Sequence, residues 1–119
     1  MTRFNISKEA DLKSAILDYL QILDNRGVVY CDRLNSGSLL VAGKGDKRYK
    51  VQLCKDGTSD IFFVNCGRIY FLECKRKGEE QRADQKEFQR KVEEVGAIYW
   101  VVDDFETFLK LMKEYKIEV

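Results

Sequence analysis

The sequence predicts a mixed α/β domain in which a central sheet is flanked by helices. Apolar residues recur at three- and four-residue spacing in three segments, which is the period of a helix with one buried face. Between these segments lie short runs rich in β-branched and aromatic residues and bounded by glycine turns, as is typical of strands. The chain of 119 residues is 45% hydrophobic, which suits one domain over residues 1–119 with one core.

Helices are expected at the start, in the second half and near the end of the chain. In the first of them Leu12, Ile16 and Leu20 share one face, Ser7 can cap the start, and Gly27 follows the end. The expected helices cover residues 7–24, 79–96 and 103–115. The expected strands cover residues 27–34, 38–42, 48–54, 60–65, 68–75 and 97–102, with a short edge strand over 116–119. The strands before the middle helix should pair antiparallel, whereas the two strands that flank it should be parallel.

The composition excludes several classes of protein. No apolar run approaches the length of a membrane span and the N-terminus lacks a signal peptide's apolar block, so we expect an intracellular, cytoplasmic protein with no membrane partner. The sequence contains no histidine, which excludes serine–histidine and cysteine–histidine catalysis. Its four cysteines lack the close spacing of a zinc site, which favours free thiols. An enzyme built from this sequence must therefore use carboxylates and lysine, with or without a bound metal.

Basic residues gather locally although the net charge is only +1. Lys44, Lys47 and Arg48 lie within a few residues of one another, and Lys77 ends a second basic run. Such clusters suit the phosphate backbone of a nucleic acid. The alternative is ordinary solvated charge on a surface.

The stretch YFLECKRK, residues 70–77, begins as a buried strand and ends in an acid and a lysine. Alternation along a strand places Glu73 and Lys75 on one face and the Cys74 side chain on the other. If residues 60–65 and 68–75 form a hairpin, Asp60 lies opposite Glu73. Two opposed carboxylates repel each other unless a positive charge lies between them, which a hard divalent cation provides. The alternative is an ion pair at a fraying strand end.

This arrangement has a chemical rationale. A cation held by Asp60 and Glu73 lowers the pKa of a bound water and offsets charge on a phosphate. Lys75, on the same face, can orient that water or stabilise charge in the transition state. The Cys74 side chain should lie in the core, while its backbone carbonyl can still reach the metal.

The residues that carry this chemistry resemble the PD-(D/E)XK nuclease superfamily and, within it, the VRR-Nuc (virus-type replication–repair nuclease) group. That group has an acid on the first helix, a G-x-x-D turn, an E-x-K strand, a glutamine on the next helix and a glycine before a hydrophobic strand. The matching positions here are Glu9, Gly57 with Asp60, Glu73 with Lys75, Gln85 and Gly96. For Glu9 the alternative is a carboxylate that favours the helix dipole, and for Gln85 a glutamine on the helix surface.

The resemblance implies a restriction-endonuclease-like αβββαβ core and a DNA endonuclease that hydrolyses phosphodiester bonds with Mg²⁺ or Mn²⁺. The metal ligands that it implies are Glu9, Asp60, Glu73 and the Cys74 carbonyl, with Lys75 and Gln85 as catalytic residues. Lys44, Lys47, Arg48 and Lys77 are expected to contact DNA.

The resemblance further implies a homodimer, from a bacterium or a phage-infected host, that cuts branched DNA such as four-way (Holliday) junctions. Two alternatives stay open. One is a restriction-type endonuclease that reads sequence, and the other is a non-catalytic DNA-binding subunit whose acids are structural.

Overall fold

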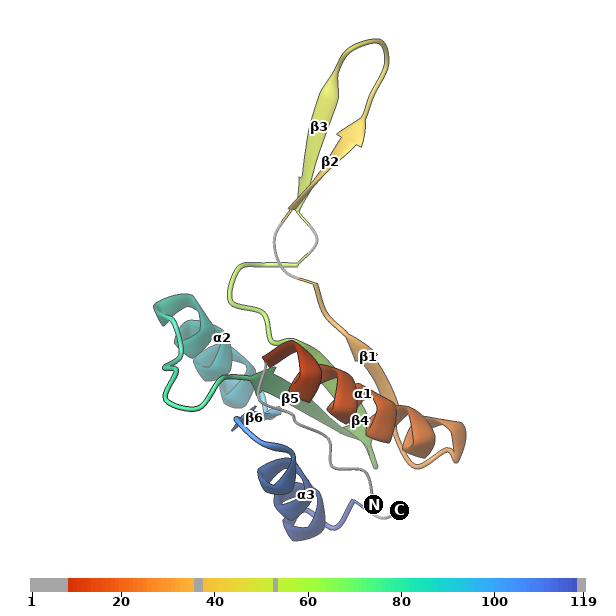
Figure 1. The fold of residues 1–119 in the computed structure, drawn as a ribbon, viewed down its shortest axis with the longest axis vertical. Coiled ribbons are helices and arrows are strands. Elements are labelled where there is room, and N and C mark those ends of the chain that lie inside the picture. The colour runs from red at the N-terminus through yellow and green to blue at the C-terminus, as the bar shows by residue number, and fades with distance from the viewer. Residues whose placement is uncertain (1–8, 36–37, 53, 118–119) are drawn as a thin grey trace.

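The computed structural model describes residues 9–35, 38–52 and 54–117 and confirms the mixed α/β fold (Figure 1). The helices are α1 (Glu9–Asn25), α2 (Ala83–Glu94) and α3 (Phe105–Glu114). The strands are β1 (Tyr30–Arg33), β2 (Ser38–Ala42), β3 (Arg48–Gln52), β4 (Ile61–Asn65), β5 (Arg68–Cys74) and β6 (Ile98–Val102). No helix in these ranges has the length and apolar character needed to cross a membrane.

The central sheet has the strand order β1-β4-β5-β6. β4 pairs antiparallel with both β1 and β5, whereas β5 and β6 are parallel and are joined through α2. The expected αβββαβ order is therefore confirmed, with the β2–β3 hairpin inserted between β1 and β4. The β4–β5 turn is tight because Cys66 and Gly67 both adopt positive φ, at 50° and 78°, as a two-residue hairpin loop requires.

The two faces of the sheet are covered by different helices. Tyr70, Leu72 and Cys74 alternate along β5 onto the face that packs in the main core, which also contains the buried residues of α1 and α3. The residues between them face the other way, where Phe71 lies edge-on against Phe88 of α2. Glu73 has the same parity as Phe71, so β5 presents its acid on the α2 side of the sheet.

The β2–β3 hairpin projects from the body of the molecule (Figure 1). The longest dimension of the molecule is 52 Å, against 38 and 33 Å for the other two. Its radius of gyration is 16.2 Å, whereas a compact chain of this length has about 13–14 Å. The hairpin is therefore an arm rather than a part of the core.

Several element bounds differ from those expected. α2 begins at Ala83 rather than at residue 79, because residues 76–79 form a turn, closed by a 3.0 Å hydrogen bond from Glu79 N–H to the Arg76 carbonyl with Gly78 at φ 82°. Lys116 and Ile117 are not in a strand; Ile117 packs into the core, with 4% of its surface exposed. Ser7 and residues 118–119 lie outside the described ranges.

Candidate metal-binding active site

Asp60 directly precedes β4 and lies beside the end of β5. The register of the two strands ends with Ile61 paired with Leu72, and the Asp60 backbone N–H donates to the Leu72 carbonyl at 3.1 Å rather than continuing the ladder to Glu73. The predicted proximity of the two acids is confirmed, because a carboxylate oxygen of Asp60 and one of Glu73 lie within 4.8 Å of each other.

A third carboxylate comes from the first turn of α1. One ligand oxygen from each of Glu9, Asp60 and Glu73 lies within 4.8 Å of the other two. Glu9 and Asp60 are partly exposed, whereas Glu73 is buried. The acid expected on the first helix thus reaches the hairpin acids, and the cluster opens toward solvent on one side.

Glu73 is the most constrained member of the cluster. Only 3% of its surface is exposed, and its Oε1 accepts a hydrogen bond from Gln85 Nε2 at 3.0 Å. Its Oε2 is inaccessible and has no hydrogen-bond partner in the described chain. Burial, and then the negative charge of Asp60, raise the pKa of Glu73 to about 8, although Lys75 acts in the opposite direction. A cation would satisfy this oxygen, whose isolation otherwise costs about 1–3 kcal/mol.

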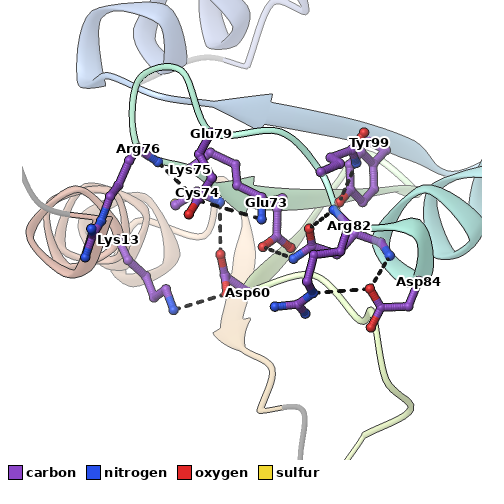
Figure 2. Close-up of polar contacts among 12 residues, drawn as sticks. Lys13, Asp60, Glu73, Cys74, Lys75, Arg76, Glu79, Arg82, Asp84 and Tyr99 are labelled. Atoms are coloured by element: carbon purple, nitrogen blue, oxygen red, sulfur yellow. Dashed lines mark hydrogen bonds and ion pairs between the residues drawn. The ribbon is translucent and has the colours of Figure 1, made fainter.

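Asp60 is held by both of its oxygens (Figure 2). Oδ2 accepts the backbone N–H of Cys74 at 2.9 Å, and Oδ1 forms an ion pair with Lys13 Nζ at 3.1 Å. Burial by itself would lower the pKa of Lys13, but Asp60 raises it above its ordinary value. Lys13 is not among the residues predicted from the sequence. The available signal was its spacing of four residues from Glu9, which places both side chains on one side of α1.

Lys75 lies on the Glu73 face, as alternation predicts, and only 6% of its surface is exposed. Its Nζ is 3.9 Å from Glu79 Oε1, and its backbone N–H donates to the Val102 carbonyl of β6 at 2.9 Å. Because its charge lowers the pKa of Glu73, the ammonium group is close enough to act on the acid cluster electrostatically.

Cys74 faces the core through its side chain, which is fully buried, as expected. Burial raises the pKa of its thiol to about 12, so the sulfur stays protonated and is a poor metal ligand. The Cys74 N–H points at Asp60. Since the N–H and C=O groups of a strand residue point to the same side, the carbonyl also lies on the Asp60 side of the strand.

Gln85 is buried, with 3% of its surface exposed, and both ends of its amide are engaged. Its Oε1 accepts the Arg82 N–H at 2.9 Å at the start of α2, while its Nε2 donates to Glu73. The structure therefore connects Gln85 to the cluster through Glu73. Gln85 therefore holds the Glu73 side chain in place and leaves Oε2, rather than Oε1, without a hydrogen bond.

Gly57 joins the Asp60 loop to the same helix. It has φ +85°, and a Cβ at this position would lie 2.2 Å from the Asp84 carbonyl oxygen. Only glycine permits both this backbone conformation and this approach. The loop that leads into Asp60 is therefore seated against the first turn of α2, one residue from Gln85.

The four basic residues expected to contact DNA lie outside the acid cluster. Lys44, Lys47 and Arg48 are exposed on the hairpin arm. Lys77 follows β5, is 75% exposed and lies 3.6 Å from Asp104. The two groups are therefore separate basic features on different elements.

The donor set of the cluster fits a hard divalent cation. Its side-chain ligands are three carboxylates, the chain has no histidine, and the nearby thiol of Cys74 is buried in the core on the opposite face. Oxygen-only sites of this kind suit Mg²⁺ or Mn²⁺ better than Zn²⁺. A scan of protein-family models gave no match to this chain, and a search of curated proteins found no significant relative.

Proposed function

We propose that this chain is a metal-dependent deoxyribonuclease that hydrolyses phosphodiester bonds with Mg²⁺ or Mn²⁺. The observation that carries the proposal is the state of Glu73. One oxygen of its buried side chain accepts a hydrogen bond from Gln85, and the other has no partner among the described residues. A carboxylate oxygen of Asp60 and one of Glu9 lie within 4.8 Å of a Glu73 carboxylate oxygen, close enough for the three acids to share one cation. Burying an acid beside two others with one oxygen unsatisfied is unfavourable for stability, and a bound cation would offset this cost.

Each residue of the cluster has a role in this reaction. When bound, the metal supplies a Lewis acid that activates water and offsets phosphate charge. Glu9, Asp60 and Glu73 would hold it, together with the Cys74 carbonyl. Gln85 keeps the Glu73 carboxylate oriented through its hydrogen bond.

The two lysines of the site act on negative charge. Lys75, buried beside Glu73, stabilises charge that develops on the phosphate in the transition state. Lys13 forms an ion pair with Asp60 in the metal-free protein. Its ammonium group can also contact a phosphate of the bound substrate.

The resemblance of the acids, lysine and glutamine to the VRR-Nuc pattern motivates the substrate. We propose branched DNA such as a four-way junction, cut by a homodimer inside a bacterial or phage-infected cell. A junction calls for two symmetric incisions, and the described residues of one chain supply one acid cluster. Twofold symmetry provides the second.

The test is cleavage of labelled four-way junctions, flaps and linear duplexes by the purified protein in Mn²⁺. We expect cleavage of branched substrates, and its loss in Asp60→Asn and Lys75→Met with folding retained. Asp18→Asn and Lys110→Met are matched controls because both residues are exposed on helices, and they should cleave like the wild type.

Each contrary result has a distinct meaning. Folded protein that cuts none of these substrates in Mn²⁺ or Mg²⁺ would refute the nuclease proposal and favour a DNA-binding subunit with structural acids. Cuts at one sequence in linear duplex would favour a restriction-type enzyme. Wild-type cleavage by Asp60→Asn and Lys75→Met would show that the site lies elsewhere.

A further inference from the structure

The β2–β3 hairpin leaves the body and returns to it at the acid cluster. β1 ends at Arg33, opposite Ile61, and the Leu34 N–H donates to the Asp60 carbonyl at 2.8 Å. The segment that forms the arm therefore leaves the sheet after Leu34 and rejoins it at Asp60, and these two residues are neighbours in space. Both connections of the arm therefore reach the sheet at the residue that belongs to the acid cluster.

The arm is basic along one face and at its tip. In the β2–β3 register Lys50 lies opposite Leu40, and Arg48 opposite Ala42, so both cations project from the same face. Lys44 and Lys47 lie in the tip loop, which is closed by a 2.8 Å hydrogen bond from Gly43 N–H to the Lys47 carbonyl. All four cations are exposed, and Asp46 is the only acid between residues 38 and 52.

The opposite face carries Val41 and Tyr49, which pair across the strands and are 44% and 52% exposed. The Tyr49 ring lies over Gly43, where a Cβ would come within 2.0 Å of the ring. The aromatic ring is therefore packed on the arm's own backbone even though it is exposed. An isolated two-stranded hairpin is marginally stable in water, so an arm of this kind is expected to gain order from a partner.

We propose that this arm enters the major groove of duplex DNA on one side of the cleavage point. The inference rests on the proposed function and extends it, since it states where the substrate must be double-stranded. A two-stranded β-ribbon fits the major groove, and the arm has four cations for flanking phosphates. A second copy that paired arm to arm is a poorer occupant, because it would bring together two segments that each carry four cations and a single acid, and like charges brought together in an interface are unfavourable.

The length of the arm sets where the contact falls. About seven residues from base to tip, at about 3.3 Å each, reach about 23 Å. This distance corresponds to about seven base pairs at about 3.4 Å per base pair. The hairpin itself therefore spans about seven base pairs of groove, and a substrate arm must supply at least this length of duplex to engage it fully.

The experiment compares Lys44→Ala/Lys47→Ala with Lys110→Ala/Lys113→Ala, which removes the same charge from the exposed side of α3. Binding to a four-way junction is measured in EDTA over a salt series, and dimethyl sulfate protection of guanine N7 is mapped along each arm. We expect the hairpin variant alone to reduce the slope of log K against log salt by about 1.8. It should also lose N7 protection within a stretch of about seven base pairs on one side of the branch, because guanine N7 lies in the major groove.

An equal change of slope in the two variants, or N7 protection that the hairpin variant keeps, would overturn the proposal. So would an unchanged slope accompanied by a smaller particle mass, which would make the arm an interface between two copies. Cleavage in Mn²⁺ is scored separately: if the wild type cuts nothing, the nuclease proposal fails while the slope and the footprint still decide the role of the arm.

Discussion

Glu73→Gln should remove a pH dependence of stability that the metal-free wild type shows between about pH 5 and 8. Burial and the neighbouring Asp60 raise the pKa of Glu73 to about 8 in the folded protein, whereas an unfolded chain releases this proton near pH 4.3. Glutamine keeps an oxygen that can accept the hydrogen bond from Gln85 but has no proton to lose. The substitution therefore isolates the charge.

The sign and size follow from proton linkage. Between the two pKa values the folded state holds one proton more than the unfolded state, so raising the pH favours unfolding. The stabilisation is fully present below the unfolded pKa and is lost as the pH rises through the folded pKa. One proton corresponds to about 1.4 kcal/mol of unfolding free energy per pH unit. Asp104 and Glu87 have lowered pKa values, so they change the pH dependence of stability at pH values more acidic than this window.

The assay is urea unfolding in EDTA at pH 5, 6, 7 and 8, with circular dichroism as the measured signal. We expect the wild type to lose stability steadily across the series and Glu73→Gln to remain level. Saturating Mn²⁺ should stabilise the wild type more at pH 8 than at pH 6, since metal and proton compete for the same carboxylate. Parallel curves for the two proteins in EDTA would refute the assignment of this titration to Glu73.

Three further predictions concern the surroundings of the cluster. Gln85→Leu removes the donor that orients Glu73, and titration calorimetry should show Mn²⁺ affinity falling about 10- to 100-fold; wild-type affinity would contradict this role. Gly57→Ala should lower stability by about 1–3 kcal/mol in thermal unfolding, more than Gly45→Ala, which has φ +71° but open space around it; equal losses would mean that the approach to α2 is unimportant. Lys13→Met should bind Mn²⁺ more tightly, on the order of tenfold, because a competing cation is removed, and weaker binding would show that the lysine supports the site instead.

The central part of the site could be predicted from the sequence because it depends on local rules. Strand alternation put Glu73 and Lys75 on one face, and the length of the hairpin put Asp60 opposite Glu73. The same rules sent the Cys74 side chain to the core, where it lies. Each inference needed only the pleat of a strand and one tight turn.

The rest of the site depends on how helices dock, which sequence periodicity does not determine. The hydrophobic stripe of α1 showed which side faces the sheet but not that Lys13 would reach Asp60. Gln85 was predicted as a catalytic residue, but its hydrogen bond to Glu73 was not predicted, because it depends on α2 beginning at Ala83 with its first turn against the Gly57 loop. The sequence also did not predict that the β2–β3 hairpin projects from the body, since its strands have the same local pattern as those of the central sheet.

The hydrogen bond between Leu34 and Asp60 has a consequence for how such a protein can change. The two residues lie together whatever chain joins them, and the entropy of closing a longer or shorter loop varies only slowly with its length. The β2–β3 hairpin within this segment can therefore be exchanged or resized with little effect on the sheet, as long as the Gly57 loop that packs on α2 is kept. Selectivity for new targets could then arise by grafting at this one junction, while the chemistry next to it is inherited unchanged.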